Sequence, residues 1–231
     1  MTIHGLQKMT LLDYPGRVAC TVFTAGCNFR CPFCHNARLV TTIDPAEAYD
    51  EEEVLSFLKK RVGLLDGVCF TGGEPLLQKD IEGFMRKVRE LGYLIKLDTN
   101  GSFPDRLRSV IDAGLVDYVA MDIKNCREKY ALTAGFSGEL LPAIEQSIAL
   151  LMEGRVQYEF RTTVMNELHT VEGMASIGAW IHGADRYFIQ SFTDSGELVG
   201  QGTYTAPDTK TLLQMLDAVK PHVPAAALRG V

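Results

Sequence analysis

The chain has 231 residues, 46% of them hydrophobic, and a formal net charge of −6 at pH 7. This length allows one substantial hydrophobic core, so disulfides or an obligate partner are not required for folding. The acidic balance and the lack of a basic stripe argue against nucleic acid or an anionic membrane as the main partner.

The start of the chain and its apolar runs bear on location and on domain number. No charged leader with an apolar stretch opens the sequence, and no run approaches the roughly 20 apolar residues of a membrane span. We therefore expect a cytoplasmic protein with free thiols. One domain is expected over residues 1–231, with residues 1–17 as an N-terminal extension and residues 221–231 as a C-terminal tail.

Six short apolar runs, rich in β-branched and aromatic residues, are predicted to be strands. Most of them lack a clean alternation of apolar and polar residues, which is typical of parallel strands buried on both faces. The runs begin near Val18, Gly67, Tyr93, Tyr118, Tyr158 and Arg186.

Between and after these runs, apolar residues recur at helical spacing and are predicted to be core-facing stripes of helices. A glycine stands where four of these helices should end. The acidic stretch that starts at Asp50 is predicted to be a helix N-terminus with Asp50 as its cap. The stripes cover residues 54–62, 81–91, 107–111, 141–151, 171–181 and 212–219, and the glycines are Gly92, Gly114, Gly154 and Gly183.

Six pairs of strand and helix predict an α/β fold, either an open doubly wound sheet or a partial barrel. Every polar motif stands at the C-terminal end of a strand. In a barrel such loops converge on one mouth, whereas a doubly wound sheet gathers them at one switch point. The motifs are the cysteine loop TAGCNFRCPFCHN, TGGEP at residues 71–75, DTNG at residues 98–101 and MDIKN at residues 121–125.

The cysteine loop carries Cys27, Cys31 and Cys34 in the spacing CxxxCxxC. Three thiolates can hold a four-iron cluster and leave one iron without a protein ligand, and an open iron indicates chemistry. Structural zinc is an alternative, with His35 or Cys20 as the fourth ligand. Cys20 suits that alternative poorly, because it lies inside the first apolar run.

The cysteine triplet, Phe33 before the last cysteine and the following GGEP turn resemble the radical S-adenosylmethionine (SAM) superfamily over nearly the whole chain. The resemblance implies a partial (β/α)6 barrel, with a parallel sheet and helices outside. It also implies one 4Fe-4S cluster on Cys27, Cys31 and Cys34, which cleaves SAM reductively to a 5′-deoxyadenosyl radical. No second cysteine-rich insert is present, so one cluster is expected.

The same resemblance implies where SAM binds. The backbone of Gly72 and Gly73 and the side chain of Glu74 would meet the methionine part of SAM, with Glu74 accepting from its ammonium. The backbone near Phe33 would contact the adenine. Independently of the resemblance, His35 and Asn36 directly follow the last cysteine, so both are expected to hydrogen-bond to the cluster or to SAM. The blander interpretation of the glycine motif is a turn that leads into a helix.

A narrower resemblance rests on CPFCHN, DTNG and MDIK together with the opening of the chain. These look like activating enzymes of glycyl-radical enzymes, above all the anaerobic ribonucleoside-triphosphate reductase activating proteins, with pyruvate formate-lyase activating enzymes as relatives. Residues at the matching positions would surround the SAM carboxylate and ribose, sometimes with a monovalent cation. Helix capping and a surface charge pair are the blander alternatives. The residues are Asp98, Thr99, Asn100, Asp122 and Lys124.

Two residues of the later strands are also candidates. Arg161 lies in the fifth apolar run and needs an anionic partner, which is the SAM carboxylate, Glu74 or a structural ion pair. Gln190 stands where formate-lyase activating enzymes often carry a histidine near SAM, so it is expected to contact SAM while the exact substrate stays open. For His169 and His182, surface or capping roles are expected.

An activating enzyme acts on a glycine in a loop of a folded protein, so its mouth must admit a peptide. The segments 125–138 and 191–205 are expected to border that loop. A flavodoxin or ferredoxin is the electron donor that the resemblance implies. The alternatives are a small-molecule enzyme resembling the 7-carboxy-7-deazaguanine synthases and, outside enzymes, a zinc or electron-carrying module.

Overall fold

The computed structural model describes residues 1–194 and 196–230, so Ser195 of the predicted segment 191–205 and Val231 of the predicted tail lie outside the described residues. One sheet of eight strands runs through them in sequence order. All neighbours are parallel except the first pair. The strands are β1 (Ile3–Thr10), β2 (Ala19–Thr24), β3 (Gly67–Gly72), β4 (Leu94–Thr99), β5 (Tyr118–Asp122), β6 (Gln157–Val164), β7 (Tyr187–Ser191) and β8 (Ala227–Arg229).

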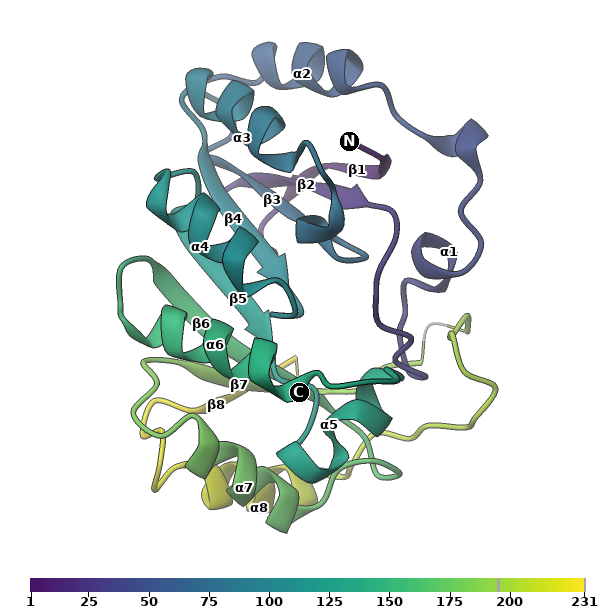
Figure 1. Ribbon diagram of the computed structural model, residues 1–231, viewed down its shortest axis with the longest axis vertical. Helices are drawn as coiled ribbons and strands as arrows, with labels where there is room; N and C mark the ends of the chain where they lie inside the picture. The colour runs from purple at the N-terminus through teal and green to yellow at the C-terminus, as the bar shows by residue number, and fades with distance from the viewer. Residues whose placement is uncertain (195, 231) are drawn as a thin grey trace.

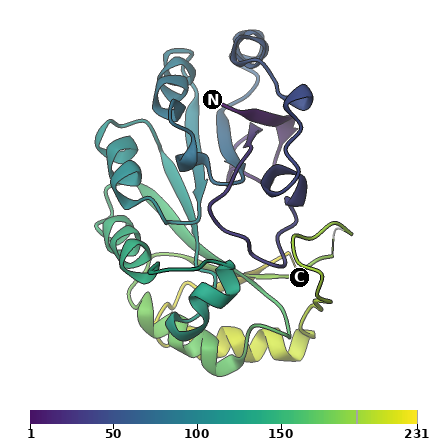
Figure 2. The ribbon, with the colours of Figure 1, turned by 45° about the vertical axis from the view of Figure 1, so that its right-hand side comes forward.

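The sheet curves, and its helices lie mainly on the outer, convex side, as Figures 1 and 2 show. The helices are α1 (Ala37–Val40), α2 (Glu51–Lys59), α3 (Ile81–Glu90), α4 (Pro104–Asp112), α5 (Arg127–Ala134), α6 (Leu141–Met152), α7 (Val171–Trp180) and α8 (Thr209–Val219), with short 3-10 turns η1 (Pro45–Glu47) and η2 (Pro75–Leu77).

The strand order confirms the partial barrel and contradicts a doubly wound sheet, in which the order would reverse at a switch point. β2 to β7 are the six predicted strands. β1 and β8 form the two edges of the open sheet, and neither was predicted. They arise from residues 3–10 and 227–229, within the segments expected as extension and tail.

The helices form for the reasons that the sequence indicated. The apolar stripe of α3 is buried, with Ile81, Phe84 and Val88 at most 1% exposed. Asp50 caps α2, its side chain accepting a hydrogen bond from the Glu52 amide. The predicted helix-ending glycines all have positive φ, a conformation in which a side chain is strained: Gly92, Gly114, Gly154 and Gly183.

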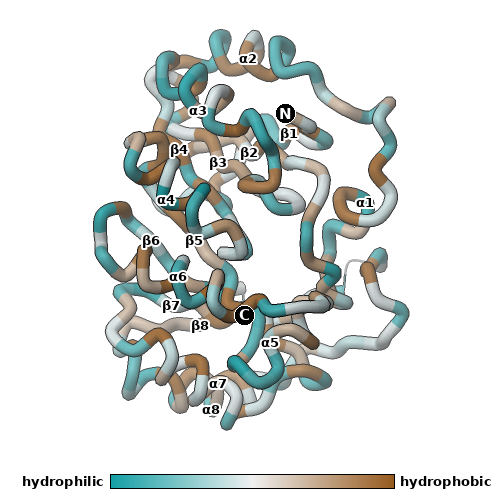
Figure 3. The backbone as a smooth tube through the Cα atoms, in the orientation of Figure 1, coloured by the Kyte–Doolittle hydropathy of each residue, from teal (hydrophilic) through white to brown (hydrophobic). Residues whose placement is uncertain are grey.

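The two faces of the strands differ, which the sequence pattern did not reveal. On β4 the side chains of Ile95 and Leu97 belong to the apolar core under the helices, whereas Lys96 and Asp98 point to the opposite side. β6 repeats this, with Phe160 in the core and Arg161 in an ion pair with Asp98. Figure 3 shows the hydrophobic stretches along the strands and helices. The concave interior of the barrel is therefore polar but still buried.

No helix within the described residues is both long enough and apolar enough to cross a membrane.

Candidate functional site

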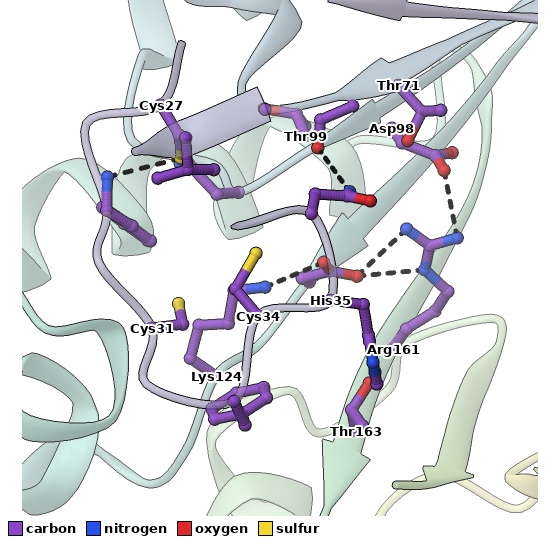
Figure 4. Close-up of a pocket in the computed structure, with 18 residues that line it drawn as sticks. Cys27, Cys31, Cys34, His35, Thr71, Asp98, Thr99, Lys124, Arg161 and Thr163 are labelled. Carbon is purple, nitrogen blue, oxygen red and sulfur yellow. Dashed lines mark hydrogen bonds and ion pairs between the residues drawn. The ribbon is translucent and has the colours of Figure 1, made fainter. Parts of the chain in front are cut away.

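One cavity lies at the C-terminal ends of β2 to β6 and brings most of the predicted site residues together (Figure 4). The loops after β2, β3, β4 and β5 contribute, together with residues of β6, as expected when parallel strands end at one mouth. The predicted residues that line it are Cys27, Cys31, Phe33, Cys34, Asn36, Gly72, Gly73, Asp98, Thr99, Asn100, Asp122, Lys124 and Arg161. Glu74 and Gln190 do not line it.

The cysteine loop between β2 and α1 rests on the end of α5. The Arg30 amide donates to the Ala134 carbonyl over 2.9 Å, and the Cys31 sulfur lies 3.7 Å from the same oxygen. Gly135 follows with φ of 58°, and a Cβ at this position would lie 2.1 Å from the Arg30 carbonyl oxygen. Only glycine permits this approach, so the C-terminus of α5 packs directly against the cysteine loop and helps to fix its conformation.

The three thiols of this loop are free of disulfides and lie on one cavity. Burial raises the pKa of the Cys31 thiol to about 12 and also raises the pKa of Cys27. The Phe29 amide, 3.3 Å away, and the Asn100 side-chain amide, 3.8 Å away, both donate to the Cys27 sulfur. Buried thiols become thiolates when a metal cluster binds them, and donors aimed at sulfur stabilise that form, so this set fits an iron-sulfur cluster.

No three His, Cys, Asp or Glu side chains among residues 1–194 and 196–230 are grouped so that they could hold a single metal ion.

The glycine pair at the end of β3 lets the cysteine loop approach closely. A Cβ on Gly73 would lie 2.0 Å from the Gly26 carbonyl oxygen, and Gly72 has φ of 111°. Asn36 locks the two segments together, because its side-chain amide donates to the Gly72 carbonyl over 2.8 Å. Gly73 is therefore required for the contact with Gly26, and Gly72 for the contact with Thr24 of β2, before any ligand is considered.

Glu74 lies beneath the cavity and not on its surface. Its side chain is fully buried, and its carboxylate accepts from the Leu76 amide at 3.0 Å, the Thr99 hydroxyl at 2.8 Å and the Asn100 amide at 2.7 Å. Burial raises the pKa of Glu74 to about 7, against the effect of these donors. Glu74 thus joins the ends of β3 and β4, and its contact with the SAM ammonium stays a prediction.

Charged side chains cover the inner wall of the cavity. Arg161 bonds to Asp122 over 3.0 Å and to Asp98 over 3.3 Å, so its partners are these aspartates and not Glu74. Lys124 lies 2.9 Å from Asp122, and Lys96 pairs with Asp98. Burial alone would raise the pKa of Asp122, but Lys124 and Arg161 lower it to about 2.

Gln190 and His169 are two candidate residues from the later part of the chain. The β6 residue Thr163 lines the cavity, whereas Gln190, its neighbour on β7, does not. For His169 a surface or capping role was expected; it is 3% exposed, so the surface role is wrong. Its Nε2 lies 2.9 Å from the Lys124 carbonyl oxygen, and its Nδ1 accepts from the Met165 amide. Burial lowers the pKa of His169, so the neutral ring supports the Lys124 backbone.

The two segments expected to border a peptide differ in structure. Residues 125–138 are not a free loop, since they contain α5 and its contact with the cysteine loop. The described part of 191–205 lies against the other side of that loop. Phe192 stacks on His35 with ring centroids 5.4 Å apart, and the Gly200 amide donates to the Pro32 carbonyl over 2.8 Å. Phe192 and the close approach of Gly200 to Pro32 were not recognised in the sequence.

Comparison with known proteins gives a family match and several relatives. Residues 21–165, more than half of the chain, match the Radical SAM superfamily. A Methanocaldococcus jannaschii protein named as a glycyl-radical enzyme activating enzyme is 31% identical over 198 residues, which cover 82% of this chain and 79% of that protein. The pyruvate formate-lyase-activating enzyme of Clostridium pasteurianum is 32% identical over 129 residues, covering 53% of this chain and 52% of that enzyme. The 7-carboxy-7-deazaguanine synthase of Thermococcus kodakarensis is 30% identical over 183 residues and 70% of each chain.

Solved structures share the fold. Streptococcus suis SuiB superposes with a TM-score of 0.70 at 14% identity, covering 91% of this chain and 48% of SuiB. A domain of a pyruvate-formate lyase-activating enzyme from Bacteroides vulgatus gives 0.58 at 16% identity, covering 71% of this chain and 99% of that domain. The family uses a 4Fe-4S cluster and SAM. The chain belongs to the radical SAM superfamily and is one of its enzymes.

Proposed function

We propose that the chain activates a glycyl-radical enzyme by abstracting hydrogen from a glycine of that partner, and that the partner is an anaerobic ribonucleoside-triphosphate reductase. The observation that carries the radical chemistry is the single cavity shared by three free cysteines and the charged cluster around Arg161. The glycyl-radical step is supported by the similarity to proteins named as activating enzymes.

The cysteine loop is proposed to hold the cofactor through Cys27, Cys31 and Cys34. When bound, the cluster and SAM supply the reductive cleavage of a carbon-sulfur bond and the 5′-deoxyadenosyl radical. The protein contributes donors to the Cys27 sulfur from Asn100 and from the Phe29 backbone. Phe33, 5% exposed, shields the same loop from water.

The charged wall is proposed to bind the polar end of SAM. Lys124 and Arg161 line the cavity, and the buried Lys96 behind them completes three cations against the two carboxylates of Asp98 and Asp122, so these ion pairs carry one excess positive charge. That excess suits the SAM carboxylate. Because Arg161 already bridges the two aspartates, we propose that no monovalent cation is needed there.

The remaining predicted residues surround this wall. The Gly72 and Gly73 backbone lines the cavity and is proposed to meet the methionine part of SAM. Thr99 and Asn36 are proposed to contact SAM directly, since both line the same cavity. Glu74 acts through Thr99 and Asn100, which its carboxylate holds in place. Gln190 neighbours the cavity-lining Thr163 in the sheet, and its contact with SAM stays a prediction.

The partner's glycine loop is proposed to enter beside residues 196–205. This segment contacts the cysteine loop through the Gly200 amide and contacts α1 through the ion pair of Glu197 with Arg38, whose shortest distance is 2.9 Å. Gln201 and Thr203 are exposed near these contacts and can meet another protein. A flavodoxin or ferredoxin is proposed as the electron donor, in the reducing cytoplasm that keeps the thiols free.

The recognition role is tested by replacing both Gln201 and Thr203 with lysine. We expect glycyl-radical formation on the reductase, measured by electron paramagnetic resonance, to fall at least tenfold while 5′-deoxyadenosine formation without partner is unchanged. Gln214→Lys on the exposed face of α8 is the matched control and should change neither activity. Equal loss of both activities in the double variant would contradict a recognition role for this segment.

A radical SAM enzyme acting on a small heterocycle is the second candidate, supported by the similarity to a 7-carboxy-7-deazaguanine synthase. The two proposals differ in what consumes the radical. Transfer of deuterium from a glycine-deuterated partner protein into 5′-deoxyadenosine supports the activating enzyme. Deuterium transfer only from a heterocycle would replace it with the second candidate.

A further inference from the structure

A second cavity lies at the opposite end of the sheet from the cysteines. It is bordered by the residues that begin the parallel strands, including Leu94 of β4, Tyr118 of β5 and Gln157 of β6. Its volume is about 610 Å³, which is within the range of roughly 300–1,000 Å³ typical of small-molecule sites. Nothing in the proposed radical chemistry uses this end of the barrel.

The charge of this cavity is opposite to that of the chain. Arg17, Arg155 and Arg186 line it, and Asp117 is its one acidic residue within the described residues. Asp117 is already engaged, because Arg89 pairs with it and the Ile95 amide donates to it over 2.7 Å. A protein with a net charge of −6 therefore concentrates positive charge in one recess, which attracts anions.

Two of the three arginines have no carboxylate partner. Arg155 pairs with Asp112 at 2.7 Å and with Glu153 at 3.0 Å. In contrast, neither Arg17 nor Arg186 forms an ion pair with any residue in the ranges 1–194 and 196–230. Their guanidinium groups remain available to an incoming anion.

A buried network lies behind one wall of the cavity. The hydroxyl of Tyr118, which lines the cavity, donates to the Glu159 carboxylate over 2.7 Å. Glu159 is fully buried and accepts two hydrogen bonds from Arg229, at 2.6 and 2.9 Å. The Tyr118 ring also packs against Tyr14, with centroids 6.1 Å apart. Tyr14 and Tyr118 are thus held by their neighbours, whereas the exposed side chains of Arg17 and Arg186 line the cavity from the solvent side.

We propose that this second cavity binds a small phosphate-bearing molecule through Arg17 and Arg186. The planar fork of guanidinium donors matches the oxygens of a phosphate group and can bind two of them at once. Leu94, Val116 and Val156 supply an apolar wall for the remainder of the molecule. The site is separate from the SAM cavity and does not depend on the identity of the protein substrate.

The test is calorimetric titration of the anaerobically reconstituted protein with pyrophosphate, in the presence of saturating SAM. We expect saturable binding that weakens at least tenfold in Arg17→Gln and in Arg186→Gln. Arg108→Gln, which removes an exposed arginine of α4 outside both cavities, is the charge-matched control and should bind as the wild type does. Cleavage of SAM by all three variants checks that they fold.

Several results would overturn the proposal. One is the absence of saturable pyrophosphate binding, and another is an equal loss in Arg108→Gln, which indicates unspecific attraction. Competition between pyrophosphate and SAM would place the anion in the first cavity. A parallel titration with citrate separates phosphate from carboxylate, and tighter binding of citrate would reject the phosphate assignment.

Discussion

The guanidinium of Arg161 holds the carboxylate of Asp122, with Nε and one terminal nitrogen each 3.0 Å from the same oxygen. The two residues are direct neighbours across the β5 and β6 ladder, so the sheet register itself fixes the pair. The arginine also reaches Asp98 on β4. One side chain thus ties the ends of three strands together where the proposed SAM site lies.

Arg161→Gln is expected to lower the free energy of unfolding by about 3 kcal/mol, because it leaves buried carboxylates without their main partner. Affinity for SAM should fall at least tenfold, as measured by calorimetry. Arg86→Gln breaks an exposed pair with Glu82 and should change stability by less than about 1 kcal/mol with no effect on SAM binding. Unchanged SAM affinity in the Arg161 variant would refute its place at the site.

The close packing of Gly135 against the cysteine loop is predicted to affect how well the loop retains iron. Gly135→Ala should reduce iron retention after reconstitution at least twofold, because the new Cβ would meet the Arg30 carbonyl oxygen and displace the cysteine loop. Gly114→Ala is the matched control: φ there is 61°, yet nothing lies within 4 Å of the added Cβ. Both variants carry the backbone strain of about 1 kcal/mol. If both variants lose iron equally, the packing of Gly135 against Arg30 has no specific role in cluster binding.

His169 predicts a pH dependence of stability. Burial lowers its folded pKa below the ordinary value of about 6.5, so the unfolded chain binds the proton more readily. The stabilising effect of the neutral ring is complete above about pH 6.5 and is lost as the pH falls through the folded pKa. In urea denaturation at pH values from 8 to 5, the wild type should lose more stability than His169→Gln. Parallel curves for the two proteins would contradict this.

The sequence predicted the six central strands and the mouth where their motifs gather, because buried apolar runs and helical stripes are local signals. β1 and β8 were missed since neither has such a run, and each forms by pairing with the edge of an existing sheet. α5 was mistaken for a loop because its sequence lacks a regular apolar stripe; it is held by packing, with Tyr130 fully buried.

Some site residues could likewise be placed from the sequence, whereas others could not. Cys31 and Asp122 could be placed at the mouth because their motifs follow predicted strands, and both line the cavity. The direction of Glu74 could not, because its three donors come from the next turn and from the adjacent strand end. The second cavity was also invisible in the sequence, since Arg17 and Arg186 are brought together only by the order of the strands.

The proposed role of the cysteine loop can be measured directly by anaerobic reconstitution with iron and sulfide, followed by dithionite reduction with SAM. The proposed function predicts about four irons per chain, formation of 5′-deoxyadenosine and methionine, and loss of both in Cys31→Ala. Cys20→Ala, a buried core residue, should keep its iron and its activity. Tightly bound zinc without SAM cleavage, or iron that depends equally on Cys20, would contradict the assignment of the three cysteines.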